Sequence, residues 1–155
     1  MGNRRLIEVA VLMVLLSLPE WAACGQAANP YSEARALILA TAAPEGAIGA
    51  EAGRLMDAQQ YQAAMNMEFE RVKKWKEVES EVWQRYLDYP SISMSLLWEA
   101  AIVRTETWAC MTRSAMLHYR GLDRMAFEED KMTALRAQEY NLIMDEVQTV
   151  AASGM

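Results

Sequence analysis

Histidine, cysteine, glycine and proline are all scarce in this chain of 155 residues. One His and two Cys are too few for a zinc site built from these residues or for a disulfide framework. Seven Gly and four Pro disfavour collagen-like, loop-rich and β-sandwich classes. Basic residues are outnumbered, 15 against 21 acidic ones, and a general nucleic-acid binder needs a basic face. The remaining composition, 53% hydrophobic with 12 Met, is typical of one folded domain, and we expect no nucleic acid among its partners.

The N-terminus has the pattern of a secretory signal peptide. Arg4 and Arg5 precede an apolar stretch over residues 6–18, Pro19 ends that stretch, and small residues follow. The apolar stretch is shorter than the roughly 20 residues that a membrane-spanning helix needs. We therefore predict that residues 1–27 form a cleaved signal peptide and that the product is exported, either periplasmic or secreted.

Two cleavage sites fit the residues after the apolar stretch. Small residues at 25 and 27 suit ordinary signal peptidase and would leave Ala28 as the first residue. Residues 22–25 resemble the end of a bacterial lipobox, in which Cys24 would carry a lipid and anchor the chain to a membrane. Trp21 stands where lipoproteins carry an aliphatic residue, so the soluble product is favoured. Both routes leave Cys110 without an intramolecular partner and predict no disulfide, although an unmodified Cys24 would permit a bridge between them.

Residues 28–155 are predicted to form a single helical domain. Asn29 and Pro30 form a helix start, Pro90 ends a long proline-free segment, and Gly121 suits a left-handed helix end. These signals predict helices over about 30–42, about 50–88, about 92–120 and about 123–151. Short connections make successive long helices antiparallel neighbours. The expected fold is all-α: an elongated antiparallel three-helix bundle with a short extra N-terminal helix, in which the longest helix extends beyond its partners.

The distribution of apolar residues predicts which faces are buried. From Tyr61 to Tyr89, apolar residues recur every three or four positions. The helix over 92–120 has one narrow charged stripe, so we expect it to be central and most buried; the stripe consists of Glu99, Glu106, Arg113 and Arg120. The last helix is expected to direct seven apolar residues toward the core: Met125, Met132, Leu135, Leu142, Ile143, Val147 and Val150.

The sequence gives only weak signals for a catalytic, cofactor or metal site. His118, the single histidine, could ligate haem together with a Met, but no Cys-x-x-Cys-His motif is present. Methionines near Cys110 and in the Met65–Met67 segment could bind copper(I), yet neighbouring positions point to different helix faces. Phosphate-loop, dinucleotide-binding and His-Glu-x-x-His motifs are missing. We predict no catalytic residue, no cofactor and no metal, and expect the protein not to be an enzyme.

Aromatic and basic side chains suggest where a partner could bind. A short basic cluster surrounds one Trp, but acidic residues follow it directly and favour a solvated helix face; the cluster is Arg71, Lys73, Lys74, Trp75 and Lys76. Four Trp residues from Trp75 to Trp108 exceed what three helices need in a core. Because Trp is enriched at binding hot spots, we predict Trp75, Trp83 and Trp98 as interaction anchors.

An export signal, a long helix that outreaches its neighbours and a Met- and Trp-rich surface are together similar to the small pilus-associated helical subunits of conjugative type IV secretion systems. This resemblance concerns organisation and transfers no residue. It implies a non-enzymatic structural or interaction component of a bacterial cell-envelope assembly, with other envelope proteins or a second copy as partner. The alternatives are a periplasmic ligand-carrying bundle, for haem or copper through His118, and a periplasmic chaperone or stress protein.

Overall fold

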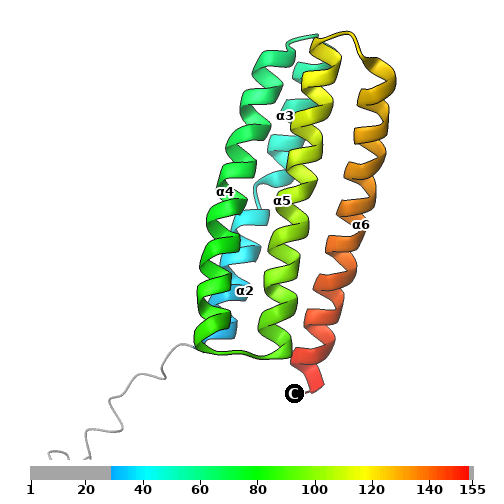
Figure 1. Cartoon of the computed structure of the whole chain (residues 1–155). Helices are drawn as coiled ribbons and strands as arrows, with labels where there is room; N and C mark the ends of the chain where they lie inside the picture. Colours follow the sequence, from blue (N-terminus) through cyan, green and yellow to red (C-terminus); the bar gives the residue numbers. More distant parts are fainter. Residues whose placement is uncertain (1–28, 154–155) are drawn as a thin grey trace, which may run out of the picture.

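The structure, a computed structural model, describes residues 29–153, which form five helices and no strand (Figure 1). The helices are α2 (Pro30–Ala42), α3 (Glu45–Asp57), α4 (Tyr61–Asp88), α5 (Ile92–Tyr119) and α6 (Asp123–Ser153). The prediction of an all-helical chain is confirmed for this part of the sequence. The predicted signal peptide, the Ala28 cleavage site and Cys24 lie outside the described residues.

The three long helices run antiparallel, side by side, with α5 between α4 and α6 (Figure 1). Helices α2 and α3 follow one another along the bundle behind these helices, where α2 contacts α4 and α5 and α3 contacts α4. The hydroxyl of Tyr31 in α2 also donates to the backbone carbonyl of Val147 in α6 at 3.3 Å. The long helices are therefore accompanied by two short helices and not by the single one that the sequence predicted.

The predicted helix over 50–88 is wrong, because the structure divides this segment into α3 and α4. Neither Pro nor Gly lies at the break; instead Gln59 adopts a left-handed conformation with φ 58°. The backbone N–H of Gln59 donates to Met56 O at 2.9 Å, and that of Gln60 donates to Leu55 O at 2.8 Å. These bonds satisfy the last carbonyls of α3. Helices α4 and α5 have 28 residues each, so the expected overhang of one long helix is also wrong.

Other helix boundaries follow the local signals in the sequence. The Asn29 side chain accepts a hydrogen bond from the Tyr31 backbone N–H at 3.0 Å, as an N-cap residue does. The Ser91 hydroxyl accepts from the Met94 N–H at 3.1 Å at the start of α5. Gly121 follows α5 with φ 70°, the left-handed conformation expected of it.

Helix α5 is the most buried element of the described chain, as predicted. Thirteen of its residues are buried, and they meet α4 on one side and α6 on the other. The charged stripe lies on the exposed surface: Glu99, Glu106, Arg113 and Arg120. The buried set also contains Thr105 and Thr107, whose hydroxyls donate to backbone carbonyls one turn earlier at 2.9 and 2.8 Å.

Helix α6 differs from the prediction. Ile143 and Val147 are buried and Val150 is partly buried, as expected. Four other residues expected in the core are exposed, at 56% for Met125, 42% for Met132, 57% for Leu135 and 70% for Leu142. The reason is that α6 lies at the edge of the bundle and packs mainly on α5, so only one narrow line of its residues is covered.

Across residues 29–153, every helix is too short or too polar to cross a lipid bilayer.

Candidate functional site

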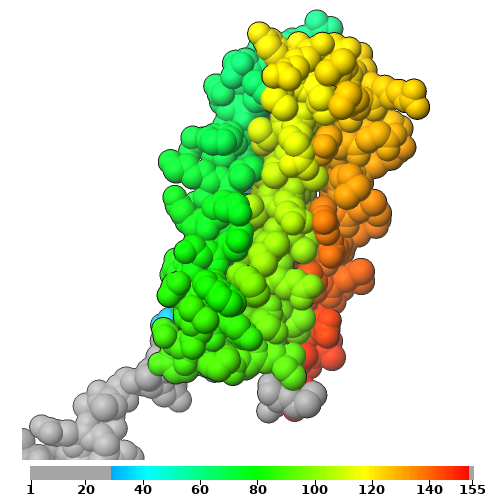
Figure 2. Space-filling view, viewed as in Figure 1, coloured from blue at the N-terminus to red at the C-terminus, as the bar shows by residue number. Residues whose placement is uncertain are grey.

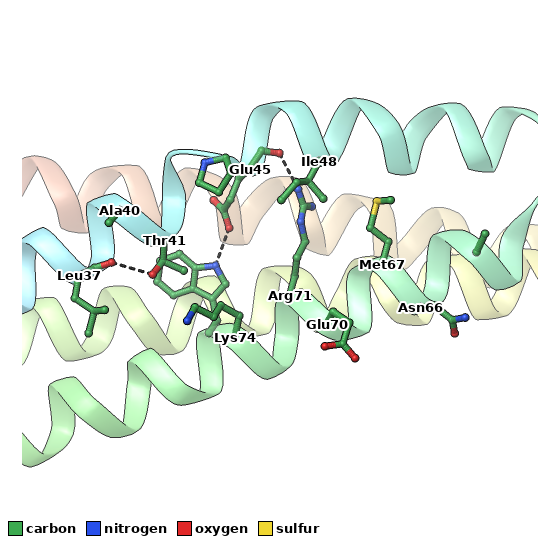
Figure 3. A pocket seen from close by; sticks show the side chains of 13 residues that line it. Leu37, Ala40, Thr41, Glu45, Ile48, Asn66, Met67, Glu70, Arg71 and Lys74 are labelled. Carbon is green, nitrogen blue, oxygen red and sulfur yellow. Dashed lines mark hydrogen bonds between the residues drawn. The ribbon is translucent and has the colours of Figure 1, made fainter.

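A groove lies between α4 and the consecutive helices α2 and α3 (Figure 3). Its volume is about 910 Å³, within the usual range for binding clefts. The lining is mainly apolar, and polar groups are contributed mostly by α4. The lining residues are Leu37, Ala40, Thr41, Pro44, Glu45, Ile48, Ala63, Asn66, Met67, Glu70, Arg71, Lys74 and Trp75.

The groove follows from the break between α2 and α3. Pro44 has no backbone N–H and cannot continue α2, so the chain turns after Ala42 and begins α3 at Glu45. Ala40 on α2 and Ala63 on α4 have short side chains that leave space between the helices. An apolar groove with polar groups on one side is suited to an apolar or amphipathic ligand.

Glu45, the first residue of α3, is the centre of a buried hydrogen-bond network at the base of the groove. Its Oε1 accepts from Trp75 Nε1 at 2.7 Å and from Trp108 Nε1 at 2.5 Å. Its Oε2 accepts from Arg104 Nε at 2.8 Å, and the Arg104 Nη2 group completes a two-point ion pair. The carboxylate, only 6% exposed as a residue, thus joins α3 to α4 and α5.

Arg71 adds a second buried charge beside Glu45. Its Nη2 donates to the backbone carbonyl of Glu45 at 2.7 Å (Figure 3). Its Nη1 donates to Glu68 Oε2 at 3.1 Å. Its guanidinium lies 3.8 Å from the centroid of the Trp108 ring, a cation–π contact. The buried Nε of Arg71 has no hydrogen-bond partner among the described residues. Desolvation raises the pKa of the Glu68 carboxyl, and the nearby Arg71 charge opposes that rise.

The network connects all three long helices. The Arg104 guanidinium lies 4.9 Å from the ring of Trp108 and also 4.9 Å from the ring of Tyr140 on α6. Burial raises the pKa of the Tyr140 hydroxyl, with the Arg104 charge acting in the opposite direction. Both carboxylate oxygens of Glu45 are occupied by donors from the chain itself. The network therefore holds α3 in place at the base of the groove.

Two residues of the predicted basic cluster belong to this buried region and not to a solvated surface. Arg71 is 6% exposed and Trp75 is 1% exposed. Trp75 is consequently inaccessible to a partner on the outer surface, contrary to its predicted role as an exposed anchor. The cluster's lysines are exposed, and Lys74 and Lys76 form ion pairs with Glu77 and Glu79 one turn later, at 3.7 and 3.4 Å.

Trp83 and Trp98, the other predicted anchors, pack on each other across α4 and α5. Their ring centroids are 4.3 Å apart, and Tyr86 lies 5.4 Å from Trp83. Both Trp residues are half-buried and line a shallow depression of about 400 Å³. Part of each indole is therefore accessible to a partner.

His118 and Cys110 lie away from the groove. His118 stacks on Tyr61 with ring centroids 6.0 Å apart, and its Nδ1 lies 2.9 Å from Oδ1 of Asp123. Cys110 is buried on α5, its thiol accepts a hydrogen bond from Arg113, and burial raises its pKa. Within residues 29–153, no three His, Cys, Asp or Glu side chains gather in a way that could hold a metal ion.

Comparison of the chain with protein-family models, with curated proteins and with solved structures found no match.

Sequence reasoning missed Glu45 and Arg104 and assigned Arg71 to the wrong face. One signal was present: Glu68, Arg71 and Trp75 follow each other at steps of three and four and continue into Val78 and Val82, which are buried. A charged pair on the same stripe as core residues indicates a buried ion pair. No local signal identifies Glu45, because its partners lie 30, 59 and 63 positions away.

Proposed function

We propose that this protein is a non-enzymatic helical component of a bacterial cell-envelope assembly that binds an apolar segment of a partner protein in the groove between α2, α3 and α4. The groove itself carries the proposal. Its lining is mainly apolar, and Glu70 and Lys74 provide charges of both signs for orienting an amphipathic segment. The half-buried indoles of Trp83 and Trp98 offer a second contact area on α4 and α5.

The buried charges favour binding over catalysis. A catalytic carboxylate needs access to substrate, whereas both oxygens of Glu45 accept hydrogen bonds from buried donors of the same chain. Glu68 is buried against Arg71 and lines a small cavity on the other side of α3. A role in maintaining the shape of the groove explains both residues.

The location in the cell envelope depends on the predicted signal peptide. Pilus-associated subunits of conjugative type IV secretion systems remain our example of such an assembly. The overhanging helix that contributed to this resemblance is not part of the structure, so the example depends on the export signal and the Met- and Trp-rich surface. The broader class, an exported interaction component, does not need that helix.

A site-specific photo-crosslinking experiment in the native cell envelope tests the proposal. A photoreactive residue at Met67, inside the groove, is expected to form a discrete adduct with a partner protein. The matched control is Gln84, which is exposed on the same helix and outside the groove. Ala63→Trp should fill the groove and abolish the Met67 adduct. Equal adducts from both positions, or an adduct with a small molecule instead of a protein, would contradict the proposal.

A further inference from the structure

We infer that the outer face of α6 binds the α6 of a second copy of this chain in antiparallel orientation. This inference does not depend on the groove or on its occupant. Figure 2 shows α6, in orange and red, along one edge of the molecule, where no other helix covers its outer side. Met125, Met132, Leu135 and Leu142 are between 42% and 70% exposed on this helix.

The spacing of these four residues matches a helix–helix seam. They follow each other at steps of seven, three and seven, which are steps of the heptad pattern that keeps a seam on a partner helix; Glu128 and Glu139 occupy the two intervening seam positions. The seam from Met125 to Leu142 extends over roughly 26 Å at the rise of an α-helix. Scattered exposed apolar residues need no explanation, but an aligned series on an edge helix indicates a contact surface.

The seam is complementary to itself when two copies run antiparallel. In one register, Met125 faces Leu142 of the second copy, and Met132 faces its Leu135. The two-fold axis repeats both pairs, so all eight apolar side chains find an apolar partner.

Charge selects this orientation over a parallel one. Arg124 and Asp145 are exposed at opposite ends of the seam and form no ion pair with any residue from 29 to 153. In the antiparallel register, each Arg124 lies next to Asp145 of the other copy. Parallel helices would place Arg124 beside Arg124 and Asp145 beside Asp145, which repel.

Two glutamates within the seam are already neutralised in their own chain. Glu128 and Glu139 face each other across the antiparallel pair. Lys131 Nζ lies 3.0 Å from Glu128 Oε1, and Arg136 Nη1 lies 2.6 Å from Glu139 Oε2. These ion pairs offset the repulsion between the two carboxylates, so the two α6 helices can come into contact.

Sedimentation velocity on the full chain over a range of concentrations tests the association. We expect a reversible monomer–dimer equilibrium. Leu135→Glu should raise the dissociation constant by at least about 100-fold, because two buried leucines are lost per dimer. Leu87→Glu is the matched control, since Leu87 is 54% exposed on α4 and away from the seam. A chain that stays monomeric, or a Leu135→Glu variant that dimerises as the control does, would overturn the inference.

Charge exchange and crosslinking test the orientation. Arg124→Glu should weaken the dimer by about two- to tenfold, and adding Asp145→Arg should restore it.

Disulfide crosslinking tests the same orientation in a chain that carries Cys24→Ser and Cys110→Ala and so has no other cysteine. The double variant Met125→Cys, Leu142→Cys should give oxidised dimers, whereas Met125→Cys alone should not. Efficient crosslinking through Met125→Cys alone would show a parallel arrangement and overturn the antiparallel one. Circular dichroism of each variant verifies that the helices are retained.

Discussion

Trp108 Nε1 donates a hydrogen bond of 2.5 Å to Oε1 of Glu45, a residue 63 positions earlier in the chain. The contact joins the first turn of α3 to the middle of α5. The same oxygen accepts from Trp75 on α4 at 2.7 Å, so one carboxylate fixes a short helix on two long ones. Negative charge at this position also interacts favourably with the N-terminus of α3.

Replacing Glu45 should destabilise the protein strongly. Glu45→Ala leaves the Arg104 guanidinium and two buried indole N–H groups without their acceptor, so we expect the free energy of unfolding to fall by about 3–5 kcal/mol. Denaturant unfolding measures this change. Glu51→Ala is the control on the same helix, because its ion pair with Arg54 is exposed and contributes at most about 1 kcal/mol. If both variants lost a similar free energy of unfolding, the buried network would contribute no more to stability than an exposed ion pair does.

At the break between α3 and α4, we expect a substitution that stabilises the protein. Gln59 has φ 58°, a conformation that costs an L-residue roughly 1–2 kcal/mol. Gln59→Gly removes that cost but gives the unfolded chain more freedom, so we expect a net gain in stability of about 0.5 kcal/mol.

Gly121→Ala makes the reverse change at the other described position with positive φ, because it replaces a glycine by a residue with a Cβ. Gly121 has φ 70°, and a Cβ there would meet no atom within 4 Å. The variant should therefore lose about 1 kcal/mol from backbone strain alone. Thermal unfolding of both variants tests the pair, and a loss of stability in Gln59→Gly would contradict the expected sign.

Glu68 should make stability depend on pH. Burial raises the pKa of its carboxyl above the ordinary value of 4.5, so the folded protein binds this proton more tightly than the unfolded chain does. Its contribution to stability therefore increases as the pH falls from neutral through the raised pKa toward 4.5. We expect the difference in unfolding free energy, wild type minus Glu68→Gln, to increase on acidification over that interval. A difference that is constant, or that increases toward neutral pH, would contradict this prediction.

The N-terminal prediction is tested by the mass of the protein recovered from its own cell envelope. We expect a chain that begins at Ala28 and carries no lipid. A mass that corresponds to a lipid-modified Cys24 would instead show membrane anchoring through that residue. Recovery of the chain with Met1 still present would contradict cleavage altogether.

Helix limits were predictable wherever a residue has an intrinsic conformational preference. Asn29 and Gly121 act as expected because capping and left-handed geometry depend on the residue and its immediate neighbours. The break at Gln59 was not predictable in this way, because glutamine has no preference for positive φ.

Burial was predictable for α5, which has a long helix on each side, and not for α6. The charged stripe of α5 identified its single exposed face, whereas α6 carries more apolar residues than one neighbouring helix covers. The buried position of Arg71 could not be deduced from its charge, since it depends on Glu68 beside it and on Glu45 and Trp108 from distant segments. Long-range polar networks leave little trace in local sequence patterns.

Glu45 also lines the groove, and this has a consequence for selectivity. Widening the groove on the α3 side would pull the carboxylate away from both indoles and from Arg104. That wall is consequently stiff, while the opposite wall can adapt through the flexible side chains of Met67 and Lys74. In the proposed binding role, such a groove would select a partner segment by its fit to the fixed wall and adjust to it only at the other wall.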